Sequence, residues 1–323
     1  MTTQNPANRP RALIAMSGGV DSSVAACLMQ QAGYDCTGIT MRLTHNETLG
    51  QSGYQTCCSE KDIEDAAEVA FALDMPYQVL DFTADFRAQI IEKFIRVYET
   101  GGTPNPCIDC NKYMKFRHLL DWAAEHGMEY VVTVHYARVE QDEATGRWLL
   151  KKGLDEGKDQ SYVLYNLTQE QLARVRLPLG SLHKTEVRDI ALTWLEEAIK
   201  AGIYEAYAAV GDLYSEHFTA GSTPRDDQEA FSWYMKGAMR GDALCLFRVA
   251  VCFAEGYGTK QDIPRALRLY RQAADAGSAL ACRQLGEMYA AGIHVHREIR
   301  RALTWFLRAY ELGDQEEKRA AAI

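Results

Sequence analysis

The sequence lacks three features that would narrow its class at once. No apolar run approaches the roughly 20 residues that a membrane-spanning helix requires. The first residues lack the charged and then apolar layout of a secretory signal peptide. The 323-residue chain also has no positive excess, with 35 Lys and Arg against 44 Asp and Glu and a formal net charge of −9. We therefore predict a cytoplasmic protein without membrane contact, in which any nucleic acid is bound through a local basic rim.

The nine cysteines are unevenly placed. Cys57 and Cys58 are adjacent, and Cys107 and Cys110 form a C-x-x-C motif. In a cytosolic chain, clustered cysteines indicate redox, metal or sulfur chemistry more than a disulfide framework. Three later cysteines fall in apolar helical patterns, where we expect small core residues: Cys245, Cys252 and Cys282.

Apolar stretches alternate with helical patterns through the first half of the chain. We expect strands at 12–16, 35–41, 77–80 and 130–134, and helices at 21–31, 60–73, 86–98 and 115–126. Such alternation predicts an α/β fold, a Rossmann-like parallel sheet with helices on both faces. Ligands of such sheets bind beyond the C-terminal ends of the strands.

The pattern changes near residue 195. From Gly202 onward we find no convincing strand pattern, and glycine-led motifs at Gly241, Gly277 and Gly313 recur with a period of roughly 36 residues. The L-G-x-x-Y and A-x-x-x-Y/F elements between them resemble the Sel-one-like repeat, a relative of the tetratricopeptide repeat, over about residues 202–315. We therefore expect an α/β domain at residues 1–195 and an all-α repeat solenoid at residues 196–323, whose concave face binds a protein partner.

The strongest chemical signal is M-S-G-G-V-D-S-S at residues 16–23, after the first expected strand and at the start of the first helix. Glycines allow a tight turn that brings backbone N–H groups close to phosphate oxygens, and the helix N-terminus adds partial positive charge. Ser17 and Ser22 can donate hydrogen bonds, and Asp21 can help to hold magnesium. The motif is not a Walker loop. S-G-G-x-D-S resembles the PP-loop signature of enzymes that cleave ATP between the α- and β-phosphates; a chance turn is the alternative.

The second signal is T-P-N-P-C-I-D-C-N-K-Y-M-K-F at residues 103–116. If Cys110 lies near the N-terminus of the following helix, that terminus together with Lys112 and Lys115 favours its thiolate. A thiolate could attack an adenylated carbon or carry a persulfide sulfur. A structural zinc half-site, or no role at all, is the alternative.

Together with stretches at 38–42, 57–66, 133–136, 158–162 and 177–191, these motifs resemble the tRNA 2-thiouridylases, the MnmA family, in order over about residues 11–192. This family adenylates the 2-oxo group of the wobble uridine in Lys, Glu and Gln tRNAs, and a persulfide sulfur then displaces AMP. Holding the reactants together supplies most of the rate advantage. The resemblance implies ATP and magnesium as cofactors, tRNA as substrate and a sulfur-donor protein as partner.

The resemblance also implies roles for individual residues. The expected ATP-binding residues are Ala15, Met16, Ser17, Gly18, Gly19, Val20, Asp21, Ser22, Met41 and Val134. The expected catalytic residues are Cys110, at the position of the family's catalytic cysteine, and Cys107. The residues expected at the target base are Asn105, Pro106 and Cys107, and those expected to contact tRNA are Asp159, Gln160 and Ser161.

Three departures from the family pattern bear on sulfur transfer and tRNA binding. Cys107 stands where many members have aspartate, and Val134 stands where the family usually has glycine, so that its side chain would crowd the nucleotide. The family's second cysteine, which carries the persulfide, has no counterpart, and neither have the family's middle and C-terminal tRNA-binding portions. Cys57 and Cys58 could meet Cys107 and Cys110, and supply the thiol or ligate zinc or an iron–sulfur cluster.

The sequence therefore predicts a tRNA-uridine 2-sulfurtransferase that converts ATP to AMP and pyrophosphate, with the sulfur-transfer half left open. Its repeats would recruit a sulfur donor or replace tRNA contacts. One alternative is a catalytically incomplete PP-loop nucleotide-binding protein that acts through its repeats as an interaction or regulatory module. Another is a PP-loop enzyme with a different substrate.

Overall fold

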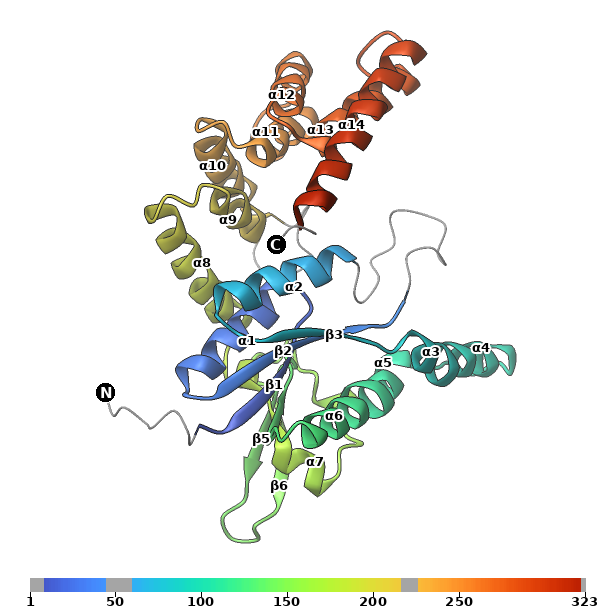
Figure 1. Cartoon of the computed structure of the whole chain (residues 1–323), viewed down its shortest axis with the longest axis vertical. Coiled ribbons are helices and arrows are strands. Elements are labelled where there is room, and N and C mark those ends of the chain that lie inside the picture. The colour runs from blue at the N-terminus through green and yellow to red at the C-terminus, as the bar shows by residue number, and fades with distance from the viewer. Residues whose placement is uncertain (1–8, 45–59, 216–225, 321–323) are drawn as a thin grey trace. The chain divides into compact units, whose positions relative to one another are not determined.

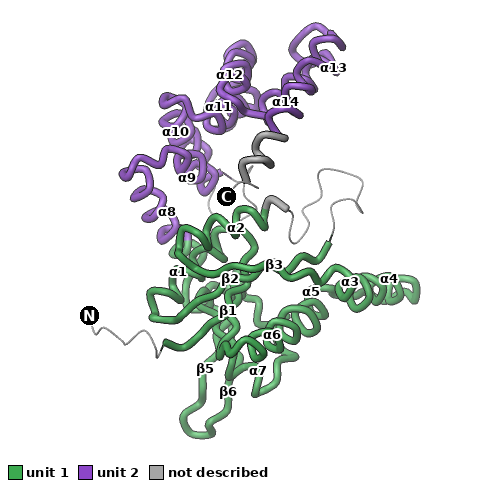
Figure 2. The backbone as a smooth tube through the Cα atoms, viewed as in Figure 1, with its two compact units in different colours: residues 1–187 green, residues 188–323 purple. Residues whose placement is uncertain are grey.

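The computed structural model describes residues 9–44, 60–215 and 226–320, with side chains except at 60–61 and 314–320. The chain divides into two compact units, Met1–Val187 and Arg188–Ile323 (Figure 2). The division falls within helix α8 (Lys184–Lys200). Each unit is described below by itself.

The first unit contains a five-stranded parallel sheet (Figure 1). Its strands are β1 (Arg11–Ala15), β2 (Asp35–Arg42), β3 (Tyr77–Asp81), β4 (Tyr130–Val132) and β7 (Val175–Arg176), in the spatial order β3-β2-β1-β4-β7. Along the chain, β2 and β3 therefore extend the sheet on one side of β1, and β4 and β7 then extend it on the other side. The point between β1 and β4 is a topological switch point, where parallel sheets bind ligands.

Helices α1 (Val20–Gln31), α2 (Glu60–Ala72) and α6 (Leu119–Glu125) pack against the faces of this sheet. The unit also contains α3 (Thr83–Phe86), α4 (Glu92–Glu99), α5 (Pro106–Asp109) and α7 (Gln169–Arg174). Figure 1 shows α1 and α2 on one face and α6 on the other. Alternate residues of β1 serve the two faces: Ile14 belongs to the core under α1 and α2, whereas Leu13 packs in the core that contains Leu119 of α6. The predicted α/β fold class is confirmed.

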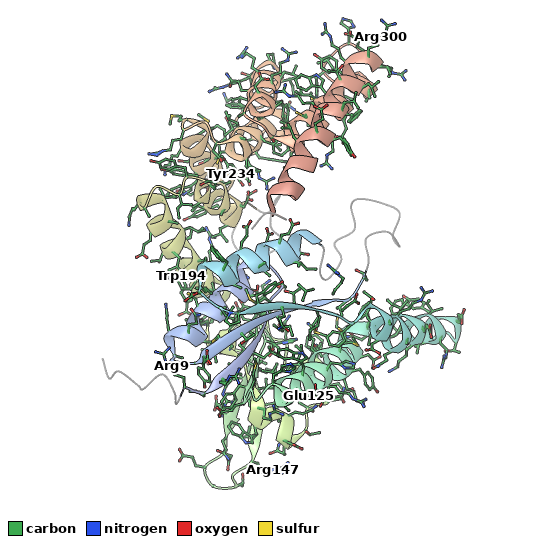
Figure 3. All side chains as sticks on the ribbon, viewed as in Figure 1. Arg9, Glu125, Arg147, Trp194, Tyr234 and Arg300 are labelled. Carbon is green, nitrogen blue, oxygen red and sulfur yellow. The ribbon has the colours of Figure 1, made fainter. Side chains whose placement is uncertain are left out.

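A β-hairpin that the sequence did not predict follows β4. Its antiparallel strands are β5 (Ala137–Gln141) and β6 (Trp148–Lys152). The Asp142 carboxylate accepts hydrogen bonds from the N–H and hydroxyl of Thr145, both at 2.7 Å, and Gly146 has a φ of 68°. Figure 3 shows Arg147 at this turn. Most of the hairpin side chains are exposed or half-buried, so their pattern lacks the apolar run by which buried strands are found.

The second unit is a stack of helices. After α8 they are α9 (Ala206–Tyr214), α10 (Asp227–Ala238), α11 (Ala243–Glu255), α12 (Ile263–Asp275), α13 (Ala279–Ala291) and α14 (Ile299–Ala320). The described residues beyond 202 contain no strand, so the all-α prediction is confirmed for them. The described part of the chain also has no helix with the length and apolarity needed to cross a membrane.

The repeated sequence elements explain how these helices begin and pack. The side chains of Asp242 and Ser278 cap α11 and α13, because each accepts a hydrogen bond from the third residue of its helix. Tyr234 of α10 is fully buried (Figure 3), and a Cβ added to Gly211 of α9 would lie 2.2 Å from its ring. The hydroxyl of Tyr234 donates to Asp212 at 2.7 Å. The glycine of the L-G-x-x-Y element thus makes room for the aromatic residue of the next helix.

Candidate active site

A cavity of about 390 Å³ lies at the C-terminal ends of β1, β2 and β4, at the switch point of the sheet. This volume lies within the range of small-molecule sites. The strand ends and the loops that follow them contribute Ala15, Met16, Ser17, Ile39, Met41, Leu43, Thr133, Val134 and His135. The helical segments from α3 to the stretch after α5 contribute Phe86, Ile90, Ile91, Phe94, Pro106, Cys107, Cys110, Asn111 and Lys115. The structure therefore brings the two sequence motifs, about 90 residues apart, into one cavity.

The glycine-rich turn after β1 is held by its own backbone and by Ser22. Gly18 has a φ of 69°, and an added Cβ would lie 2.5 Å from the carbonyl oxygen of Asp62 in α2. The buried Ser22 hydroxyl donates to the carbonyl oxygen of Gly19 at 2.8 Å and accepts from the N–H of Ser17 at 3.3 Å. Gly19 is the N-cap of α1, so the positive end of this helix dipole lies at the turn. Ser17 is exposed to the cavity, whereas the hydroxyl of Ser22 is engaged within the turn.

Asp21 forms an ion pair with Lys184, the first residue of α8. The hydroxyl of Tyr136 also donates to Asp21, at 3.3 Å. Both partners of the ion pair are largely covered, with side chains 28% exposed for Asp21 and 22% for Lys184. Burial and the neighbouring Asp21 carboxylate raise the pKa of Tyr136, so it remains a protonated donor. Sequence analysis did not select Lys184, although it falls inside the family-like stretch 177–191.

The cysteine motif lies on a helix that begins earlier than expected. The sequence predicted a helix at 115–126, but the helical path starts with α5 at Pro106 and continues through a π-helical stretch, Cys110–His118, into α6. Asn105 is the N-cap, and its side-chain oxygen accepts from the N–H of Cys107 at 3.1 Å. Proline at the first helical position suits the helix because it has no N–H to leave unpaired. Cys107 is exposed, Cys110 is half-buried, and both line the cavity.

Three buried polar side chains line the same cavity, those of Asn111, Thr133 and His135. Nδ1 of His135, which is 6% exposed, lies 2.8 Å from the hydroxyl of Thr133. Burial, and secondarily the charge of Lys115, lowers the pKa of His135 to about 3, so its ring is neutral near pH 7. Asn111 is 4% exposed, and within the described part of the chain its Oδ1 has no hydrogen-bond partner. Sequence analysis selected none of these residues, although all three fall inside the recognised motifs.

The expected tRNA contacts do not line the cavity: Asp159, Gln160 and Ser161. Gln160 is connected by a hydrogen bond to Tyr136, which follows the lining residue His135. The Asp159 carboxylate accepts from the N–H of Gly153 at 3.0 Å and from the hydroxyl of Ser161 at 2.9 Å. Burial acts to raise the pKa of Asp159, but these hydrogen bonds outweigh it and lower the pKa. The side-chain oxygen of Gln160 accepts from the N–H of Tyr136 at 3.1 Å. Tyr136 therefore links residues 159–161 to Asp21, because its N–H donates to Gln160 and its hydroxyl donates to Asp21.

The predicted metal cluster of cysteines has no support among the described residues. Within them, no group of three or more His, Cys, Asp or Glu side chains is placed to hold a metal ion. Cys57 and Cys58, which the prediction requires, lie outside the described residues. Magnesium is a different case, because it takes most of its ligands from phosphate and water and needs only one or two carboxylates. Asp21, beside the glycine-rich turn, fits that requirement.

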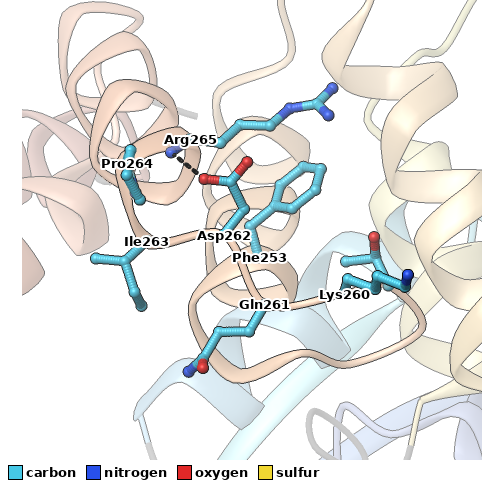
Figure 4. Close-up of a pocket in the computed structure, with 8 residues that line it drawn as sticks. Phe253, Lys260, Gln261, Asp262, Ile263, Pro264 and Arg265 are labelled. Atoms are coloured by element: carbon cyan, nitrogen blue, oxygen red, sulfur yellow. Dashed lines mark hydrogen bonds between the residues drawn. The ribbon is translucent and has the colours of Figure 1, made fainter.

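A second cavity, of about 550 Å³, lies in the repeats at the loop between α11 and α12 (Figure 4). One of its lining residues, Asp262, is the N-cap of α12, and its carboxylate accepts a hydrogen bond from the N–H of Arg265 at 3.0 Å. The guanidinium of Arg265 lies over the ring of Phe253, 4.3 Å from its centroid. The lining contains neither cysteine nor histidine, and its acid is already engaged. The residue types in the two linings therefore favour the cavity at the sheet as the active site.

Comparison with protein-family models gives two matches in different parts of the chain. The model described as the tRNA methyl transferase HUP domain matches residues 10–200, more than half of the chain. The Sel1 repeat model matches three times, at residues 205–242, 243–278 and 279–314. These intervals agree with the α/β unit and with the helical stack.

The curated relatives match slightly more than half of the chain. The tRNA-specific 2-thiouridylase MnmA of Moorella thermoacetica is 51% identical over 179 residues, which cover 55% of this chain and 50% of that protein. The protein of the same name from Clostridioides difficile is 49% identical over 181 residues, with coverage of 56% and 50%. The chain thus spans about half the length of the curated relatives it matches. A solved Sel1 repeat protein from Oxalobacter formigenes is 28% identical over 41% of this chain and 52% of that one, with a TM-score of 0.35.

Proposed function

Because the chain belongs to the tRNA methyl transferase HUP domain family, we propose that it uses ATP to thiolate a tRNA uridine at the 2-position. In the proposed reaction, the uridine 2-oxo oxygen attacks the α-phosphorus of ATP and pyrophosphate leaves. The outer sulfur of a persulfide then attacks C2, and AMP leaves with the original oxygen. A second thiol attacks the inner sulfur, so that the S–S bond breaks, a disulfide forms and the outer sulfur remains on C2. The two curated relatives described above carry the name tRNA-specific 2-thiouridylase, which supports this substrate and this product.

One observation carries the proposal: Ser17 of the PP-loop and the thiols of Cys107 and Cys110 line the same cavity. A nucleotide site without sulfur chemistry has no need of two thiols at its wall. A structural thiol pair has no need of a phosphate-binding turn. Their common cavity holds both reactants at the proximity that group transfer requires.

The nucleotide would lie across the switch point of the sheet. In this proposal, residues 15–22 bind the phosphates, and Met41 and Val134 contact the adenosine. Lys184 would turn from Asp21 to a phosphate oxygen when ATP binds, since both are anionic partners for its ammonium group. Magnesium held by Asp21 would neutralise charge on the polyphosphate.

The thiol loop would hold the base and receive the sulfur. Cys110 is the proposed catalytic thiol, with Cys107 beside it, and Asn105 and Pro106 approach the target base at the mouth of the cavity. Asp159, Gln160 and Ser161 would contact the tRNA near Tyr136. The sequence has no counterpart of the family's second cysteine, so we assign sulfur delivery to a separate donor protein. The Sel1 repeats are the candidate surface for such a partner.

A second function has an observation in its favour. The chain covers only half of its relatives' length and carries three Sel1 repeats. These features suit a PP-loop protein that binds nucleotide and acts through its repeats as an interaction or regulatory module. The two functions differ in whether bound ATP is cleaved and whether 2-thiouridine forms.

Nucleoside mass spectrometry of tRNA tests the proposal. The protein is expressed in a bacterium that lacks its own 2-thiouridylase, alongside Ser17→Ala, Cys110→Ser and, as a control, Cys27→Ser, whose thiol in α1 does not line the cavity. We expect 2-thiouridine with the wild type and the control, and none with the other two variants. A soluble, ATP-binding wild-type protein that yields no 2-thiouridine would favour the second function.

A further inference from the structure

Asn111 is a buried amide whose oxygen has no hydrogen-bond partner among the described residues. The residue is 4% exposed and lines the cavity. An unpaired buried acceptor destabilises a folded protein, and such atoms are rare. Where one persists at the wall of a ligand-sized cavity, a donor on the ligand is the group that would satisfy it.

The other amides among the expected site residues are already engaged. Asn105 is exposed, and its side-chain oxygen caps α5 through the N–H of Cys107. The side-chain oxygen of Gln160 accepts from Tyr136, outside the cavity lining. Among these three amides, Asn111 is the one that combines a place in the cavity with an unused acceptor.

The position of Asn111 relates it to the reacting base. It directly follows Cys110 in the π-helical stretch, and both residues line the cavity. Met114 and Phe116 of the same stretch are fully buried in the core, which anchors this part of the wall. A base whose C2 reacts beside the Cys110 thiol would therefore present its neighbouring N3 edge to Asn111.

We propose that the Asn111 amide selects uracil: its oxygen accepts from N3–H of the base and its NH₂ group donates to O4. This inference rests on the proposed function and deepens it. A primary amide offers one acceptor and a donor side by side, which complements that edge of uracil. Because the pairing uses N3 and O4, it leaves O2 free to attack the α-phosphorus. Cytosine presents the opposite order, an acceptor at N3 and a donor at N4, so with the amide held in the orientation that pairs with uracil both contacts are lost.

The test exchanges the amide for a carboxyl group. Asn111→Asp removes the donor to O4 and supplies an acceptor for the N4–H₂ group of cytosine. RNA hairpins with uridine or cytidine at one loop position are used as substrates. RNA-dependent pyrophosphate release is measured for wild type, Asn111→Asp and Asn111→Leu, with ATP affinity determined separately. The matched control is Asn166→Asp, since Asn166 does not line the cavity.

The wild type and the control are expected to prefer uridine. In Asn111→Asp and Asn111→Leu, the uridine-to-cytidine ratio should fall by roughly 10- to 100-fold, the discrimination carried by one bidentate amide–base pair. Their ATP affinity should stay within about twofold of wild type. The melting temperature of each variant establishes that it folds.

Two results would overturn the inference while the proposed function stands. In one, the ratio is the same in Asn111→Asp and wild type although both are active. In the other, ATP affinity falls and the ratio holds, which would assign the amide to the adenine instead. A wild-type protein that releases no pyrophosphate with the uridine hairpin would remove the proposed function and the inference together.

Discussion

Gly18 and Gly19 are neighbours, but a side chain would meet different surroundings at the two positions. At Gly18, with φ of 69°, a Cβ would lie 2.5 Å from the Asp62 carbonyl oxygen, whereas at Gly19 the nearest atom is the Ser17 oxygen at 3.9 Å. Gly18→Ala should therefore distort the phosphate-binding turn and weaken ATP binding roughly 10- to 100-fold, since such strain costs about 1–3 kcal/mol. Calorimetric titration with ATP measures this effect. Gly19→Ala is the control, and equal affinities of the two variants would refute the explanation.

Lys184 supplies a positive charge to the proposed phosphate site from a distant part of the sequence. Lys184→Met removes the partner of Asp21 and the charge available to the phosphates. We expect RNA-dependent pyrophosphate release to fall by roughly 100-fold, the typical effect of losing one positioned donor in an active site. Lys200→Met, an exposed change at the other end of α8, should have no effect. If Lys184→Met released pyrophosphate at the wild-type rate, the ion pair would have only a structural role.

His135 makes the first unit sensitive to acid. Its pKa is lowered by burial to about 3 from an ordinary value of 6.5. Between these values the unfolded chain binds a proton that the folded chain does not, so stability is lost as the pH falls below 6.5. The loss reaches at most about 1.4 kcal/mol per pH unit. His135→Gln should flatten the dependence of the unfolding free energy on pH between about 6.5 and 4, and the exposed His183→Gln should not. Parallel profiles for wild type and His135→Gln would contradict this assignment.

At the scale of elements, the repeat helices depend on a glycine. A Cβ at Gly211 of α9 would lie 2.2 Å from the Tyr234 ring. Gly211→Ala should destabilise the repeat unit by about 1–3 kcal/mol, the usual cost of overpacking a filled core. Gly313 of α14 has no atom within 4 Å of an added Cβ, so Gly313→Ala should be neutral or slightly stabilising. Thermal or denaturant unfolding measures both, and an unchanged Gly211→Ala would mean that the ring moves aside without cost.

The longer elements of the first unit could be predicted from the sequence because each has an apolar run of its own. β1, β2 and β3 lie where the sequence predicted strands, and α1 and α2 begin within one residue of the predicted positions. The exceptions have physical reasons. Strand β7 has only two residues, and the β5–β6 hairpin has few buried side chains. The helix that carries the thiols was placed too late because its start depends on the cap at Asn105 rather than on apolar spacing.

The candidate site was predictable only as far as local motifs extend. The sequence contains both motifs, and the sheet rule placed the ligand beyond the C-terminal ends of the strands. That both motifs line one cavity was found only in the structure. The ion pair of Lys184 with Asp21 joins residues 163 positions apart. The burial of Asn111 and His135 likewise arises from packing in three dimensions. Neither feature has a periodic signal in the sequence.

At the scale of the whole molecule, an α/β unit with a PP-loop precedes three Sel1 repeats. The chain spans about half the length of the relatives it matches. In our proposal this architecture separates the tasks: the first unit adenylates the base, and the repeats recruit the protein that supplies sulfur. With a net charge of −9, attraction of RNA has to come from local cations near the cavity, such as Lys112 and Lys115.

The central claim is that this chain cleaves ATP between the α- and β-phosphates on a tRNA uridine. It is tested most directly by incubating the full chain with magnesium, ATP labelled at the α-phosphate and an unmodified lysine tRNA, and by separating the products. The account predicts tRNA-dependent release of pyrophosphate and transfer of the labelled AMP group to the tRNA in equal amounts, both lost when the wobble uridine is replaced and lost in Ser17→Ala. ADP and phosphate as products, or ATP bound tightly and left intact with tRNA present, would contradict it.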